Sequence, residues 1–211
     1  MDEKPFSAYD ARLQPLRKIQ DLNLLLIGGF FMSKSRRIAV DGMLAAIYFA
    51  LKLLTIPIGN DLEISVATLA LVTTAFLLHP ADVCAVGFVG ELLTQVVRFS
   101  FSPISTPIWV APTVIYALVL GLCTFTANQK RHITEQPALC YAVCIGCGVV
   151  LAFCNTAALY FDSKIIGYYS YHMVFGVALL RALVAIGAAI VVASVALPLV
   201  RTLRKKGLAR I

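Results

Sequence analysis

The sequence predicts an all-α integral membrane protein with six transmembrane helices and both termini in the cytoplasm. Of its 211 residues, 60% are hydrophobic and only 14% are charged, whereas a soluble domain is about one quarter charged. Long apolar runs recur along the chain, and a spanning helix needs roughly 20 mostly apolar residues. The length therefore leaves room for six such helices with short loops. It leaves no space for a second, soluble domain.

Proline, glycine and polar residues separate the expected spans. Pro57-Ile-Gly-Asn60 ends the first span, and His79-Pro80 parts the second from the third. A Ser/Pro loop, a polar loop and a Tyr/Gly-rich loop make the remaining breaks. The second span is short, so we expect it to be tilted, broken or partly buried in protein. The predicted spans are residues 38–58, 63–78, 82–99, 108–127, 138–161 and 173–200.

Residues 1–33 are expected to form an N-terminal cytoplasmic or interfacial segment, and residues 34–211 the six-helix membrane domain. The apolar run 22–31 has only ten residues, which is too short to span the bilayer. No small-residue cleavage site follows it, so we do not expect a cleaved signal peptide. Alternatively, residues 1–31 are an extension or a misassigned start, because the run MSKSRRIAV from Met32 looks like a natural beginning.

The positions of Lys and Arg set the orientation. Fourteen of the eighteen basic residues precede the first span, lie between the fourth and fifth, or follow the sixth. With six spans these segments share one side of the membrane, and short loops rich in Lys and Arg stay in the cytoplasm. Five spans would put the basic tails on opposite sides. The net charge of +7 is thus a sign of orientation, and it argues against a nucleic-acid partner.

Polar side chains from four predicted spans lie at a similar depth, roughly 6–12 Å below the outer helix ends at 1.5 Å per residue. Such groups usually line a site or a water-filled cavity. All lie in the outer half, whereas an ion pathway would need them on both sides of the midplane. We therefore expect a solute-binding cavity open to the exterior. The alternative is a structural ion pair, of Glu91 with Lys52 or Arg181. The candidates are Lys52, Glu91, Gln95, Asn155 and Arg181, with Arg98 near a helix end.

Aromatic residues gather near the expected outer face. Singly they would form an interfacial belt, but beside buried polar groups they suit a planar aromatic ligand. Trp109, Tyr116 and Tyr160 are the expected aromatic walls of the cavity.

The sequence holds no recognisable motif for catalysis or metal binding. The patterns G-x-x-x-x-G-K-[ST], H-E-x-x-H and G-x-S-x-G do not occur. Cys144-Ile-Gly-Cys147 has the spacing of metal and redox motifs. It lies in an apolar helix, however, where free cysteines pack as small hydrophobic residues. We expect no catalytic residue, metal or cofactor, and energy for uphill transport would come from another subunit. Ala46-Ile-Tyr-Phe-Ala50 has the small-xxx-small spacing of a helix-docking surface.

Six stretches of the sequence form a recognisable series: 41–50, 56–65, Gly87-x-x-Gly90-Glu91, Pro103–Pro107, Trp109-Val-Ala-Pro112 and 155–181. Together, over residues 38–205, they resemble the substrate-binding S component of energy-coupling factor (ECF) vitamin transporters, in particular the folate branch. The resemblance implies six membrane helices, a vitamin pocket near the outer face and a bacterial cytoplasmic membrane location. It also implies that Ala46 and Ala50 contact a transmembrane coupling subunit, and that two separate ATPase subunits supply the energy.

The sequence departs from the folate pattern at two places. An arginine and a glycine usually follow the Trp-x-x-Pro segment, where this chain has Tyr116-Ala117. Lys52 stands where a small polar residue is more usual. We hypothesise that Lys52 supplies the missing cation, because the folate tail carries two carboxylates that a cation would bind. An S component for a different vitamin or precursor, a stand-alone channel or carrier, and a membrane enzyme are the alternatives.

Overall fold

The computed structural model describes residues 34–58, 62–98, 101–131 and 136–205. The chain divides into two compact units, Met1–Ala39 and Val40–Ile211. Only residues 34–39 of the first unit are described, so the predicted N-terminal segment 1–33 lies outside the described residues. The arrangement below is that of the second unit.

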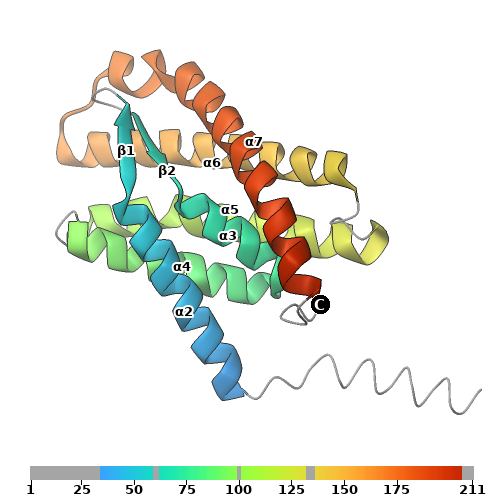
Figure 1. Ribbon diagram of the computed structural model, residues 1–211. Coiled ribbons are helices and arrows are strands. Elements are labelled where there is room, and N and C mark those ends of the chain that lie inside the picture. The colour runs from blue at the N-terminus through green and yellow to red at the C-terminus, as the bar shows by residue number, and fades with distance from the viewer. Residues whose placement is uncertain (1–33, 59–61, 99–100, 132–135, 206–211) are drawn as a thin grey trace, which may run out of the picture. The chain divides into compact units, whose positions relative to one another are not determined.

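The described chain consists of helices and one short hairpin (Figure 1), so the predicted helical class is confirmed. The elements in chain order are α2 (Lys34–Leu53), β1 (Thr55–Ile58), β2 (Leu62–Ser65), α3 (Ala67–Leu77), α4 (Pro80–Arg98), α5 (Ser105–Arg131), α6 (Pro137–Ile166), the π-helical turn η1 (His172–Gly176) and α7 (Ala178–Lys205).

The hairpin is the departure from the predicted helices. We expected the first span to reach residue 58 and the second to begin at 63, but β1 pairs antiparallel with β2 over these residues, with Thr55 opposite Ser65. Threonine and isoleucine are β-branched and favour strands. Pro57 lacks the N–H that a helix interior requires. The intervening Gly-Asn-Asp sequence is of the kind found in hairpin turns.

α3 is the element that least resembles a membrane span. Its 11 residues extend about 16 Å, roughly half the hydrocarbon thickness. Nine of the 11 are buried, and the helix lies against α4, α5 and α7. The hydroxyls of Thr73 and Thr74 donate hydrogen bonds within the helix, to the carbonyl oxygens of Leu69 and Ala70. α3 is therefore an apolar helix enclosed by protein, which agrees with the expectation that the second span is partly buried.

Four stretches of the described chain are long and apolar enough to cross a membrane: Pro80–Arg98, Ser105–Asn128, Pro137–Ile166 and His172–Leu203. These make the chain a multi-pass membrane protein. α2 has 20 residues, but Asp41, Lys52 and the basic residues of its first turn interrupt its apolar character. The number of six spans and the orientation of the termini stay predictions.

The long helices pack in sequence, α4 on α5, α5 on α6 and α6 on α7. Small residues stand where two helices come closest. A Cβ added at Gly87 of α4 would lie 3.1 Å from the Cβ of Ala117 on α5, and one at Gly148 of α6 would lie 3.2 Å from that of Ala189 on α7. In lipid, where apolar burial does not drive helices together, such close approach supplies the packing energy.

Because neighbouring helices run in opposite directions, the unit has two distinct ends. α4 finishes and α5 begins near the hairpin; α6 also finishes there, at Gly167, whose φ of 95° is left-handed, and η1 then leads into α7 (Figure 1). We call this the hairpin end. The opposite end carries the start of α4 and α6 and the finish of α5 and α7.

Candidate functional site

A cavity of about 640 Å³ lies in the hairpin half of the unit, within the range of small-molecule binding pockets. Its walls come from the second half of α4, the middle of α6 and the first halves of α5 and α7. The start of α3, Ser65 of β2, Lys52 near the end of α2, Ser102 before α5 and Met173 of η1 complete them. Among the described residues, none from the first turns of α4 and α6 or the last turns of α5 and α7 lines it.

Seven of the eight side chains predicted to bind substrate lie in this lining. They come from α2, α4, α5, α6 and α7, elements that are far apart in sequence. Their shared depth, inferred from the sequence, corresponds to one cavity. Their contacts with a ligand stay a prediction. The seven are Lys52, Glu91, Gln95, Trp109, Tyr116, Asn155 and Arg181.

Glu91 is the best-connected polar group of the cavity, and only 3% of it is exposed. Its Oε2 accepts hydrogen bonds from the Tyr48 hydroxyl at 2.6 Å and from Thr113 Oγ1 at 3.2 Å. Its Oε1 accepts one from Gln95 Nε2 at 3.1 Å. Lys52 Nζ lies 3.2 Å from Oε2. A carboxylate needs such partners because burying an unpaired charge is costly. The ion pair left open by the sequence is therefore formed between Glu91 and Lys52.

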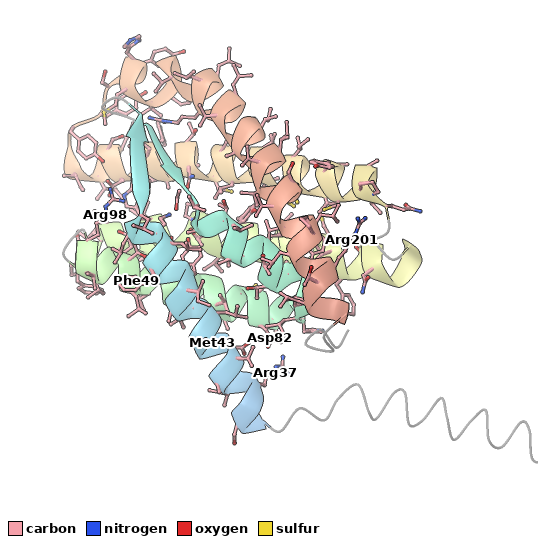
Figure 2. All side chains as sticks on the ribbon, viewed as in Figure 1. Arg37, Met43, Phe49, Asp82, Arg98 and Arg201 are labelled. Carbon is pink, nitrogen blue, oxygen red and sulfur yellow. The ribbon has the colours of Figure 1, made fainter. Side chains whose placement is uncertain are left out.

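The two arginines of the lining contact neighbouring backbone and hydroxyl groups. Arg181 donates to the carbonyl of Met173 at 3.2 Å and to that of Val174 at 3.4 Å, both of them in the π-helical turn η1. Arg98 donates to Thr55 Oγ1 at 3.3 Å, which joins the end of α4 to β1 (Figure 2). The charged residues of the described lining are thus three cations, Lys52, Arg98 and Arg181, and one carboxylate, Glu91.

Tyr160 was predicted as an aromatic wall, but the structure places it outside the cavity lining. Its ring makes edge contacts with Phe161 and Tyr169, at centroid distances of 5.5 and 5.7 Å. The Lys164 ammonium lies over both tyrosine rings, 5.3 Å from the Tyr160 centroid, a cation–π arrangement. Contact between Tyr160 and a substrate stays a prediction.

The loop after α6 holds a second polar contact near the hairpin end. The Tyr168 hydroxyl donates to Asp162 Oδ2 at 2.6 Å. Partial burial, and then this contact with the Asp162 carboxylate, raise the pKa of Tyr168 to about 12. The hydroxyl therefore stays protonated over the physiological range and holds the loop to the end of α6.

Hydroxyl groups are the part of the lining that the sequence reasoning missed. Thr residues inside apolar helices are unremarkable, because their hydroxyls return to a carbonyl of the same helix. Thr113 differs in donating to Glu91, and only the packing of α5 on α4 shows this. The Ser/Pro loop was a usable signal, since it supplies part of this set. The missed hydroxyl residues are Ser65, Thr68, Ser102, Ser105, Thr106 and Thr113.

The cysteines pack as the sequence suggested. All six are free, and Cys140, Cys144 and Cys147 of α6 are buried in the hydrophobic core. Cys144 also reaches the cavity lining. Within the described ranges, no group of three or more His, Cys, Asp or Glu side chains is arranged to hold a metal ion.

The two alanines predicted to contact a partner share one exposed face of α2. Ala46 and Ala50 are exposed and one helical turn apart. Ala45 and Tyr48, at 3% and 2% exposure, are buried on the other side. The partner contact itself stays a prediction.

Comparison with known families gives one match. The family model described as ECF-type riboflavin transporter, S component matches residues 32–205. Comparison with curated proteins and with solved structures gave no match. The matched segment contains every element of the described structure, including the cavity. The chain therefore belongs to the ECF-type riboflavin transporter S component family, and it is the substrate-binding membrane subunit of a vitamin transporter.

Proposed function

We propose that this subunit captures folate or a reduced folate from outside a bacterial cell and releases it inward with the help of an ECF module. The observation that carries this proposal is the charge of the cavity. Glu91 is offset by Lys52 at 3.2 Å, and the other two charged groups of the described lining, Arg98 and Arg181, are both cations. A site of this sign favours an anionic ligand, and guanidinium groups suit carboxylates.

The flat pterin ring of a folate would lie against an uncharged, apolar part of the cavity wall. Trp109 and the buried Tyr116 contribute aromatic walls on α5, next to small apolar residues of α6 and α7 such as Gly148 and Ala185. A pterin ring packs well in such a slot. Gln95 and Asn155 offer amide donors and acceptors for its polar edge.

The charges at the two ends of the unit support the proposed orientation. Lys130 and Arg131 finish α5, and Arg201, Arg204 and Lys205 lie in the last turns of α7, all at the end opposite the hairpin. Figure 2 shows Arg201 on this part of α7, away from Arg98 beside the hairpin. Segments rich in Lys and Arg face the cytoplasm. Six spans with both termini inside then place the cavity toward the exterior.

Membership of the family implies an ECF module as partner. We propose a transmembrane coupling subunit that docks on the exposed Ala46–Ala50 face of α2 and two ATPase subunits that hydrolyse ATP. This chain itself is proposed to catalyse no reaction and to need no cofactor.

Riboflavin is the second candidate, and two observations favour it. The family model that matches the chain carries its name. The six hydroxyl side chains of the lining also match the sugar-like hydroxyls of an uncharged ribityl chain. Riboflavin has no anionic group to match the net positive charge of the cavity lining. The two candidates therefore differ in their need for Arg181.

Equilibrium binding to the purified protein in detergent separates them. Labelled folate and labelled riboflavin are each titrated, with thiamine, biotin and pantothenate as competitors. Saturable folate binding that riboflavin does not displace supports the proposal. Tight binding of riboflavin alone refutes the folate assignment. Copurification of a coupling subunit and two ATPases tests whether the chain assembles with an ECF module. A stand-alone channel or carrier would copurify with none of these subunits.

A further inference from the structure

α2 is attached to the rest of the unit through very few contacts. Among the described elements, none packs its backbone along α2, which crosses in front of α4 (Figure 1). Beyond residue 40, only Ala45 and Tyr48 of this helix are fully buried. Lys52 is partly buried, with its side chain 24% exposed. Leu44 and Leu51 are partly buried and pack against the hydrophobic core. The polar attachment of α2 therefore depends on what Tyr48 and Lys52 contact.

The crossing point with α4 is Gly90. A Cβ at this position would collide with the Tyr48 ring and lie 3.3 Å from the carbonyl oxygen of Ala45. The absence of a side chain lets the Tyr48 ring reach over α4, and its hydroxyl then meets the carboxylate of the next residue, Glu91, at 2.6 Å.

Glu91 binds α2 at two places one turn apart, Tyr48 by a hydrogen bond and Lys52 by an ion pair of 3.2 Å. Gln95 and Thr113 donate to the same carboxylate from α4 and α5. A carboxylate has about four acceptor positions, and four protein donors lie around this one. Glu91 has little capacity left to accept hydrogen bonds from a vitamin, although it lines the cavity.

We propose that Glu91 is a positioning residue, which fastens α2 to α4 through Tyr48 and Lys52 and holds Lys52 at the cavity wall. The Lys52 ammonium has three donors, so it pairs with Glu91 and still reaches an anionic group in the cavity. A bound anion then adds a further attachment for α2. Its exposed face carries Ala46 and Ala50, so occupancy of the cavity is linked to the rigidity of the proposed docking face. The anion rests on the proposed function, whereas the fastening of α2 does not.

The fastening is tested without any vitamin. Hydrogen exchange of the backbone amides of residues 40–54 is measured by mass spectrometry on the protein in lipid nanodiscs. Tyr48→Phe and Glu91→Gln should each speed this exchange by about tenfold, since a hydrogen bond to a charged group is lost or weakened. The matched control is Tyr141→Phe, which removes an interhelical hydroxyl contact of 2.9 Å with Ser194, between α6 and α7. Unchanged exchange in α2 of both Tyr48→Phe and Glu91→Gln would overturn the proposal.

The link to the cavity is tested by adding saturating folate. Exchange in residues 40–54 of the wild-type protein should slow, and this slowing should vanish in Lys52→Met. Equal slowing in Lys52→Met, with folate shown to be bound, overturns the role of Lys52. If dialysis shows that the wild-type protein binds no folate, the proposed substrate fails. The vitamin-free exchange rates still decide whether Glu91 fastens α2.

Discussion

Replacing Gly90 by alanine adds one methyl group where α2 crosses α4. The new Cβ collides with the Tyr48 ring close to its attachment and presses on the Ala45 carbonyl at 3.3 Å. The ring must therefore move away, and its hydroxyl leaves the Glu91 carboxylate. Gly146 is the matched control, because a Cβ there meets nothing within 4 Å, and it too lies inside a long apolar helix, α6.

Two terms set the size of the effect. Forcing an extra methyl group into a packed interface costs about 1–3 kcal/mol. Losing a hydrogen bond to a charged group adds about 1.5–3 kcal/mol. Because the displaced ring relieves part of the strain, we expect about 2–5 kcal/mol in all. For a chain of this size each kcal/mol lowers the melting temperature by about 2–4 °C, so Gly90→Ala should melt about 4–20 °C lower than the wild-type protein.

The six free cysteines provide the assay. A dye that fluoresces on reacting with thiols reports unfolding in detergent, since Cys140, Cys144 and Cys147 are buried in the folded protein. Gly146→Ala should melt within about 2 °C of the wild-type protein or slightly above it, as alanine is the better helix former. If Gly90→Ala melts together with Gly146→Ala, α2 does not cross α4 at Gly90, and the reasoning on its attachment is wrong.

Three further predictions concern the ligand, the outer loop and the partner. Arg181→Met should weaken folate binding by about 10–100-fold, through loss of charge-assisted hydrogen bonds, and leave an uncharged ligand little affected; calorimetric titration measures both, and equal losses would contradict an anion contact. Tyr168 is protonated more tightly in the folded protein, with its pKa raised from 10.0 to about 12, so its stabilising contribution is present below pH 10 and is lost as the pH rises through about 12. Melting temperatures over this range should therefore fall less steeply for Tyr168→Phe, which has lost the contact with Asp162; equal slopes would speak against it. Ala46→Trp should abolish copurification of the coupling subunit without changing vitamin affinity. The control Ala157→Trp, at an exposed alanine of α6, should change neither copurification nor vitamin affinity. Retained copurification with Ala46→Trp would place the docking surface elsewhere.

Hydrophobic patterning predicted the long helices α4 to α7 to within a few residues at most ends, because bilayer thickness fixes how long an apolar run must be. It failed at β1 and β2, over Thr55–Ile58 and Leu62–Ser65. There the β-branched residues of the hairpin are as apolar as the helix before them, so hydropathy alone does not separate the two structures. The sequence Gly-Asn-Asp between the two strands, which is of the kind found in hairpin turns, was the available signal.

The candidate site, too, was predicted from the sequence only in part. Charged and amide side chains are rare in apolar helices, so Lys52, Glu91, Gln95 and Arg181 could be identified from the sequence. In the structure all four lie in one cavity lining. Tyr160 was included because aromatic residues gather near the expected outer face and because it lies in a stretch that resembles the family; in the structure its ring lies against Tyr169 and Lys164. Depth is a property of sequence position, whereas the direction of a side chain depends on how its helix packs.

The sequence by itself determined that this chain is a membrane protein, which residues are too polar to face lipid, and how deep they lie. All three conclusions follow from the free-energy cost of moving a polar group out of water. Only the tertiary structure decided which of these groups meet. Tyr48 and Thr113 gave no sign of a polar role in the sequence, yet both donate to Glu91. Such pairings depend on the close approach of three helices, which glycine and alanine permit at contact points that no local pattern specifies.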